Sequence, residues 1–218
     1  MKPNSIVLCS GGIDSVATAH YVKYKLKQSP IILFFNYQQL ALAKERKCSK
    51  LCAKQLNSQF IEITLPRMSY SNNKPLKITS LKDTSKESAK FYIPARNLIF
   101  LSHAISLAEK LRIKHLYTGF KHEGKEHYPD TTQEFLNQLN KLSSITTKIK
   151  PKIIAPLIKK DKEDIINLAL KLNIQLNKTF SCYTPINSKH CGSCLACKLR
   201  KAGFYWANQK DKTPYNSK

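Results

Sequence analysis

The segment that most constrains the fold is a glycine turn between an apolar run and a helical pattern near the N-terminus. Residues 5–9 (Ser-Ile-Val-Leu-Cys) are a short, mostly apolar run, which is typical of a buried parallel strand. Ser10-Gly11-Gly12 follows as a turn, and residues 14–27 then have the spacing of a helix. A strand, a tight turn and a helix in this order predict the first unit of an α/β fold.

The same alternation continues along the chain and predicts a doubly wound parallel sheet over residues 1–178. A small metal-binding segment over residues 179–218 is expected to follow it. Asp161 is expected to cap a helix through its carboxylate. The further strands are expected at 31–35, 59–63, 114–119 and 153–156, and the further helices at 40–56, 98–111, 131–142 and 161–172.

One stretch, residues 65–91, breaks this alternation. It is rich in Ser, Asn, Lys and Thr and has no clear hydrophobic period. Two interpretations stay open: a mobile loop that closes over a site, or a disordered insertion.

Composition excludes some classes of protein and leaves others open. No apolar run of the 218 residues reaches the ~18 needed to span a membrane. The N-terminus lacks a secretory pattern, so a cytoplasmic location is expected. The net charge of +23 is carried by scattered lysines, which favours solvated faces over a nucleic-acid site. Attraction to RNA or polyphosphate stays open, but the motifs of the chain do not require nucleic acid.

The glycine turn has the chemistry of a phosphate-binding loop. Backbone N–H groups at the start of a helix attract anions, and glycines let the backbone approach them closely. The spacing fits neither a Walker A loop nor the dinucleotide-binding glycine pattern. An ordinary Gly-Gly turn capped by Asp14 is the alternative, and Asp14 would otherwise hold Mg²⁺ or order the loop. The residues expected to bind nucleotide are Cys9, Ser10, Gly11, Gly12, Ile13, Asp14, Ser15, Val16 and Ala17.

A second motif lies near the C-terminus, where Cys182, Cys191, Cys194 and Cys197 follow C-x8-C-x2-C-x2-C. Four thiolates satisfy tetrahedral Zn²⁺, and a closed four-sulfur shell is structural. An iron–sulfur cluster also uses four thiolates, and disulfides are the remaining alternative. We expect zinc here.

The two motifs occur in the order seen in a known family, and the chain resembles the 7-cyano-7-deazaguanine synthase (QueC) family. S-G-G-x-D-S is similar to the loop of N-type ATP pyrophosphatases (PP-loop enzymes), which implies a Rossmann-like, adenine nucleotide alpha hydrolase-like fold. The resemblance extends over residues 5–204. It rests on residues 10–15, 93–100 (Ile-Pro-Ala-Arg-Asn-Leu-Ile-Phe), 128–130 (Tyr-Pro-Asp), 179–183, 191–197, Arg200, Gly203 and Phe204.

The resemblance implies an ATP-dependent C–N ligase of queuosine biosynthesis. ATP would adenylate 7-carboxy-7-deazaguanine, ammonia would give an amide, and a second ATP would convert the amide to the nitrile. The family uses ATP, Mg²⁺ and one structural Zn²⁺, and commonly forms homodimers. The family's product feeds tRNA modification, so the substrate is a free base and not tRNA.

Candidate catalytic and substrate residues follow from the same segments. Arg96 suits a carboxylate or phosphate, with a salt bridge at a helix start as the alternative. Asn97 would bind substrate or cap a helix, and Asp130 would bind the amidine edge of the base or a metal. The catalytic candidates are Asp14, Ser15, Arg96 and Asp130, and the substrate-binding candidates are Tyr37, Arg96, Asn97, Asp130 and Glu134.

The chain departs from the family pattern in two places, residues 36–41 (Asn-Tyr-Gln-Gln-Leu-Ala) and 131–132 (Thr-Thr). The nature of the product is therefore open: a nitrile, an amide, or a deazapurine coupled to a macromolecule. A tRNA-modifying PP-loop enzyme and a non-enzymatic zinc module are further alternatives. The first would bind tRNA with a steep salt dependence, and the second would not turn over ATP.

Overall fold

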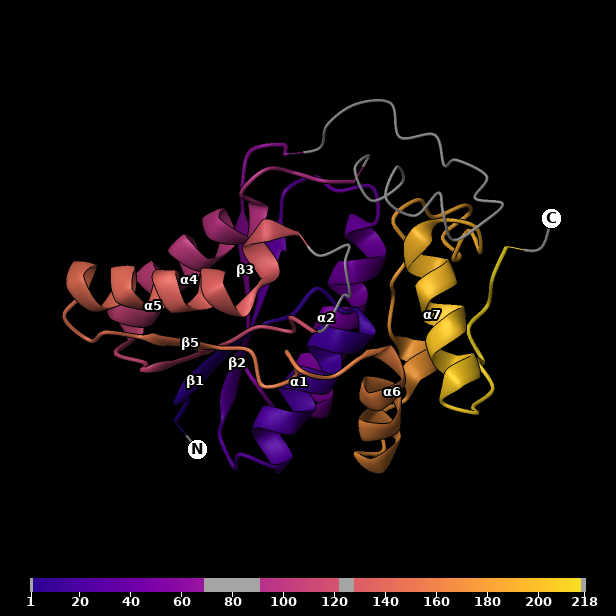
Figure 1. The fold of residues 1–218 in the computed structure, drawn as a ribbon, viewed down its shortest axis with the longest axis horizontal. Coiled ribbons are helices and arrows are strands. Elements are labelled where there is room, and N and C mark those ends of the chain that lie inside the picture. Colours follow the sequence, from indigo (N-terminus) through magenta and orange to yellow (C-terminus); the bar gives the residue numbers. More distant parts are fainter. Residues whose placement is uncertain (1, 69–90, 122–127, 217–218) are drawn as a thin grey trace.

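A computed structural model describes residues 2–68, 91–121 and 128–216 of the chain. Its centre is one parallel five-stranded sheet in the order β3-β2-β1-β4-β5 (Figure 1). Most of the segment expected to be a lid or an insertion, from 69 to 90, lies outside the described residues. The strands are β1 (Ser5–Leu8), β2 (Pro30–Asn36), β3 (Phe60–Thr64), β4 (His115–Tyr117) and β5 (Lys152–Ile154).

The sheet order places the glycine turn where a ligand is expected. Strand β1 pairs in parallel with β2 on one side and with β4 on the other. The strand order therefore reverses next to β1, and ligands of doubly wound sheets bind beyond the carboxyl ends of the strands at that reversal. Residues 10–12 leave β1 at this end.

Helices cover both faces of the sheet (Figure 1). Helices α1 (Ile13–Tyr24), α2 (Leu42–Gln55) and α6 (Lys162–Lys171) pack on one face, and α7 (Leu195–Trp206) packs against α6. Helices α4 (Arg96–Leu111) and α5 (Gln133–Thr146) cover the other face. Two short 3-10 helices, η3 (Pro129–Thr131) and η4 (Leu176–Lys178), complete the described elements.

The alternation of side chains along β1 explains the two cores. Ile6 belongs to the apolar cluster under α4 and α5, whereas Val7 belongs to the cluster under α1, α2 and α6. Both are fully buried, as expected for a parallel strand covered on both faces. The predicted doubly wound α/β class is confirmed.

Several predicted boundaries need correction. Helix α4 begins at Arg96 and not at 98, because the Asp130 carboxylate accepts a backbone N–H of its first turn. The helix expected at 131–142 is the short helix η3 followed by α5, which ends at Thr146. Helix α7 was not predicted. The cap at Asp161 is confirmed, since its Oδ1 accepts the Asp164 N–H at 3.0 Å. None of the described helices is long and apolar enough to cross a membrane.

Candidate active site and metal centre

A pocket of about 350 Å³ opens beyond the carboxyl ends of β1, β2 and β4. Its size is in the range typical of small-molecule sites. The glycine turn and the start of α1 form one wall, and aromatic side chains from residues 91–100 and from the C-terminal segment form another. Of the nine predicted nucleotide-binding residues, six line the pocket: Cys9, Ser10, Gly12, Ile13, Asp14 and Ser15. Gly11, Val16 and Ala17 do not; the latter two are buried in the core under α1.

The turn is held by its own hydroxyls and by the helix behind it. Ser10 Oγ lies 3.3 Å from Ser15 Oγ, and the Ser15 hydroxyl donates to the Gly12 carbonyl at 3.2 Å. Gly11 has φ +79°, and an added Cβ would lie 2.7 Å from the Glu45 carbonyl oxygen. The backbone amides at the start of α1 are thereby fixed next to the pocket, as a phosphate site requires.

Asp14 is ion-paired within this pocket. Lys162, the first residue of α6, donates to both Asp14 carboxylate oxygens at 2.6 Å. A Cβ at Gly203 of α7 would overlap the Lys162 side chain, so a glycine there leaves room for the lysine. Lys162 was not predicted from the sequence, and it places a positive charge beside the phosphate-type loop.

Arg96 and Tyr37 both line the pocket and lie next to each other. Burial raises the pKa of the Tyr37 hydroxyl, and the adjacent Arg96 charge opposes that shift. Burial by itself lowers the pKa of Arg96, but the hydroxyls of Tyr37 and other tyrosines and the charge of Asp130 outweigh it, so the pKa is raised. Arg96 therefore stays cationic and is half-buried in the pocket, where a charge acts more strongly on an anionic ligand than it does in open water.

Aromatic rings enclose the space beside Arg96. Phe91 packs on Tyr183 with ring centroids 4.8 Å apart, and Tyr92 stacks on Tyr128 at 5.5 Å. Both pairs line the pocket. Flat apolar walls of this kind suit a planar heterocycle.

Three predicted substrate-binding residues, Asp130, Asn97 and Glu134, have hydrogen-bond partners within the protein. Asp130 is buried and accepts both the Asn97 N–H at 2.8 Å and the Asn97 side-chain amide at 3.1 Å. Asp130 therefore fixes the start of α4, the helix that carries Arg96. Asn97 does line the pocket, whereas neither Asp130 nor Glu134 is among the described lining residues. Glu134 is exposed on α5 and accepts from Gln138.

Glu45 is a carboxylate in the pocket that the sequence analysis missed. It lies in the first turn of α2, and its Oε2 accepts from Gln39 Nε2 at 2.8 Å. Burial raises its pKa, and the Gln39 hydrogen bond and the Arg96 charge partly oppose that shift. The available signal was the glutamine at position 39, which agrees with the family pattern although Gln38 and Leu40 beside it do not.

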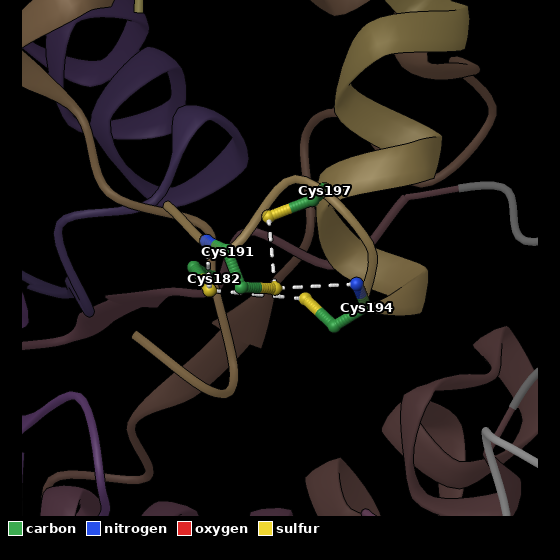
Figure 2. Close-up of side chains that lie close together, drawn as sticks. All are labelled: Cys182, Cys191, Cys194 and Cys197. Carbon is green, nitrogen blue, oxygen red and sulfur yellow. Dashed lines mark hydrogen bonds between the residues drawn. The ribbon is translucent and has the colours of Figure 1, made fainter. Parts of the chain in front are cut away.

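The four predicted cysteines converge at the start of α7, with their sulfurs directed toward one another (Figure 2). All four Sγ atoms lie within 4.8 Å of one another. The Cys182–Cys194 and Cys191–Cys197 sulfur pairs are 3.8 and 3.9 Å apart. Sulfurs held ~2.3 Å from one tetrahedral Zn²⁺ lie roughly 3.8 Å apart, so the spacing fits a single ion. The cluster could hold a metal.

Backbone N–H groups stabilise the thiolates. The N–H groups of Cys191 and Cys194 donate to sulfurs at 3.2 and 3.3 Å, and the turn between them has Gly192 at φ +79°. Hydrogen bonds among the four thiols, that with Cys182 above all, lower the pKa of Cys191, whereas hydrogen bonds within the cluster raise the pKa of Cys182 and of Cys197. Metal binding requires the thiols to be deprotonated.

The cysteine cluster is joined to the pocket. The Phe180 N–H donates to the Gly11 carbonyl at 2.9 Å, and the ring of Phe180 packs on His190. Buried Arg200 of α7 donates to the Thr179 hydroxyl at 2.9 Å and to the Ser181 hydroxyl at 3.2 Å. The segment that leads to Cys182 is therefore a wall of the pocket, and the cysteine cluster lies at its end.

Comparisons with known proteins find relatives that match nearly the whole chain. The family model described as queuosine biosynthesis protein QueC matches residues 4–208. A 7-cyano-7-deazaguanine synthase of a Nitratiruptor species is 37% identical over 98% of this chain and 99% of its own length. A 7-cyano-7-deazaguanine synthase of Methanosphaera stadtmanae is 35% identical over 99% of both chains.

One solved structure has the same fold. The U34-tRNA thiolase NcsA from Methanococcus maripaludis, solved with its 4Fe-4S cluster, superposes with a TM-score of 0.50 over 96% of this chain and 74% of that chain. The sequence identity is 14%, so the likeness shows a shared fold alone.

Proposed function

Because this chain belongs to the QueC family of queuosine biosynthesis proteins, we propose that it converts 7-carboxy-7-deazaguanine and ammonia to 7-cyano-7-deazaguanine at the expense of ATP. One observation carries the proposal: the phosphate-type loop and the half-buried cation Arg96 line a single pocket. A nucleotide and a carboxylate can therefore meet in one enclosed space. The family and its ligase activity, predicted from the motifs, are confirmed by the comparisons.

The chemistry requires two leaving groups. Attack of the substrate carboxylate on the α-phosphorus of ATP gives an acyl adenylate and pyrophosphate. Ammonia then displaces AMP to form the amide. A second ATP adenylates the amide oxygen, and loss of AMP leaves the nitrile. Neither oxygen can leave at neutral pH until it carries a phosphate, which explains why the pocket combines a phosphate site with a carboxylate site.

Each side chain has a distinct task in this scheme. The backbone amides and hydroxyls of residues 10–15 hold the β- and γ-phosphates that depart as pyrophosphate, and Lys162 adds positive charge there. Arg96 orients the carboxylate. Asp14 would hold Mg²⁺, which would neutralise the charge that develops on the departing phosphates. Asp130 acts through Asn97 by fixing the helix start that presents Arg96.

The cysteine cluster is proposed to hold one structural Zn²⁺ through Cys182, Cys191, Cys194 and Cys197. The support is the sulfur spacing, which matches one tetrahedral ion, and the absence of an open coordination position in a four-thiolate shell. A cytoplasmic location and a homodimer are also proposed. The seven free thiols are consistent with the first, and sedimentation of the zinc-loaded protein tests the second.

Mass spectrometry of the products tests the proposed reaction. Purified protein incubated with 7-carboxy-7-deazaguanine, ATP, Mg²⁺ and ammonium should yield the nitrile with two AMP per nitrile formed. One AMP and the amide would identify a ligase that stops halfway. A mass shift on a protein, or AMP formed only when tRNA is added, would favour the coupling or tRNA-modifying alternatives. No AMP under any of these conditions would contradict the proposal.

Asp14→Ala is expected to lower kcat/KM for AMP formation by at least ~100-fold, because it removes a carboxylate beside the departing phosphates. The fold should survive, since Asp14 is part-exposed in its pair with Lys162. Thermal unfolding within a few degrees of the parent, measured together with AMP release, checks both parts. Turnover close to that of the parent would count against the assigned loop.

A further inference from the structure

Both the backbone and the side chain of Glu45 are held in place by neighbouring residues. Its backbone carbonyl lies against Gly11, and its N–H donates to the Ala41 carbonyl at 2.9 Å. Its carboxylate is held by Gln39, which donates to Oε2 at 2.8 Å. The side chain thus enters the pocket in one orientation.

The orientation of Gln39 is itself determined by the backbone. Its Nε2 also donates to the Phe35 carbonyl at 3.2 Å, and its Oε1 accepts the Tyr37 N–H at 3.1 Å. Gln39 can therefore present only an N–H to Glu45. Among the described residues, no protein group donates to the other oxygen, Oε1 of Glu45. Glu45 is half-buried and lines the pocket, so this oxygen is left to accept a hydrogen bond from a ligand.

Charge places a donor beside this acceptor. Arg96 and Glu45 both line the pocket, and the Arg96 charge acts on the Glu45 carboxylate. The pocket therefore presents a cation and an anion to the same ligand. One edge of a guanine-type base presents the complementary series: the O6 acceptor, then the N1–H and 2-amino donors. In the proposed substrate the 7-carboxylate lies next to O6, so one guanidinium can meet both oxygens.

We propose that Glu45 and Arg96 select a guanine-type base, with Glu45 accepting from N1–H and the 2-amino group while Arg96 donates to O6 and the neighbouring carboxylate. This inference rests on the proposed function and deepens it, since it assigns the groups that choose the base. Asp130, the carboxylate expected to have this role, has both oxygens occupied by Asn97. An adenine-type base presents its donor and acceptor in the opposite order and is rejected.

The test pairs one substitution with one atom deleted from the substrate. In the parent, kcat/KM for 7-carboxy-7-deazaguanine should exceed that for its 2-deamino analogue, a 7-carboxy-7-deazahypoxanthine, by about 10–100-fold. In Glu45→Gln, the oxygen of the new amide turns to the Gln39 donor, so an N–H faces the base. The preference for the 2-amino substrate should then fall to roughly threefold or less, with KM for ATP unchanged.

Glu62→Gln is the matched control. Glu62 lies on β3, forms an ion pair with Arg46 of α2 and does not line the pocket. It should keep the parental preference. A Glu45→Gln enzyme that keeps the preference would overturn the assignment, as would a rise in KM for ATP alone, which would place the adenine of ATP at Glu45. A parent that turns over neither base would contradict the proposed function itself, and the two failures are therefore distinguishable.

Discussion

Cys194→Ser is expected to lose bound zinc and to unfold at least roughly 10 °C below the parent. Cys194 is fully buried, and its sulfur lies 3.8 Å from that of Cys182. Loss of a structural metal belongs to the few changes that cost ~4 kcal/mol or more, and one kcal/mol shifts the melting temperature of a chain of this size by about 2–4 °C. Zinc analysis of the purified protein and thermal unfolding measure the two effects.

The matched control is Cys48→Ser, because Cys48 is half-buried on α2 and lies outside the cluster. It should retain one zinc per chain and unfold within a few degrees of the parent. If Cys194→Ser kept full zinc and parental stability, the cluster would not be a four-thiolate metal site. Iron and sulfide in the parent would instead identify an iron–sulfur centre.

Loss of the metal in Cys194→Ser should also disturb the nucleotide pocket, although no cysteine of the cluster lines that pocket. The chain leading to Cys182 carries Phe180, whose N–H donates to Gly11, and Tyr183, whose ring packs on Phe91. Without the metal this segment has little apolar core of its own to hold it. KM for ATP should therefore rise in Cys194→Ser even at temperatures where the rest of the fold persists.

The parts of this arrangement that could be predicted from the sequence are those that depend on local patterns. All five strands were predicted, and β1 and β2 follow most directly from continuous apolar runs, because a strand buried on both faces needs such residues. The cysteine spacing predicted the cluster, and the glycine turn predicted a phosphate-type loop between the first strand and the first helix. Because Cys191, Cys194 and Cys197 are closely spaced in the chain, the cluster could be predicted without knowledge of the fold.

The parts that could not be predicted depend on contacts between distant segments. Lys162 reaches Asp14 across 148 positions, and no local pattern connects them. Both oxygens of Asp130 accept hydrogen bonds from Asn97, 33 positions earlier in the chain. The carboxylate that we expected to bind substrate therefore stabilises the start of a helix. Helix α7 was not predicted because it begins directly after Cys194, inside the segment assigned to the cysteine motif, although its buried residues Cys197, Arg200 and Phe204 have helical spacing.

Gly11→Ala is expected to destabilise the fold by about 2–5 kcal/mol and to lower AMP formation by more than ~100-fold. A residue with a Cβ at φ +79° costs ~1–2 kcal/mol, and the new Cβ would lie 2.7 Å from both Cys48 Cβ and the Glu45 carbonyl oxygen. Relief of such an overlap moves backbone and costs a further ~1–3 kcal/mol. Either the turn or the first part of α2 must shift, and a shift of ~1 Å at a reacting group costs roughly 100-fold in rate.

Gly12→Ala, in the same turn, is expected to weaken ATP binding with little effect on folding stability. Its added Cβ would meet Ser10 Oγ at 3.5 Å and the Phe180 carbonyl at 3.6 Å, which are ordinary contacts, and its φ of −76° suits any residue. Stability should therefore change by less than ~1 kcal/mol. Because Gly12 lines the pocket, its methyl group would stand where a phosphate must approach the backbone, and KM for ATP should rise. Denaturant unfolding and ATP titrations of both variants measure these effects; parental KM in Gly12→Ala would mean that phosphate binds elsewhere.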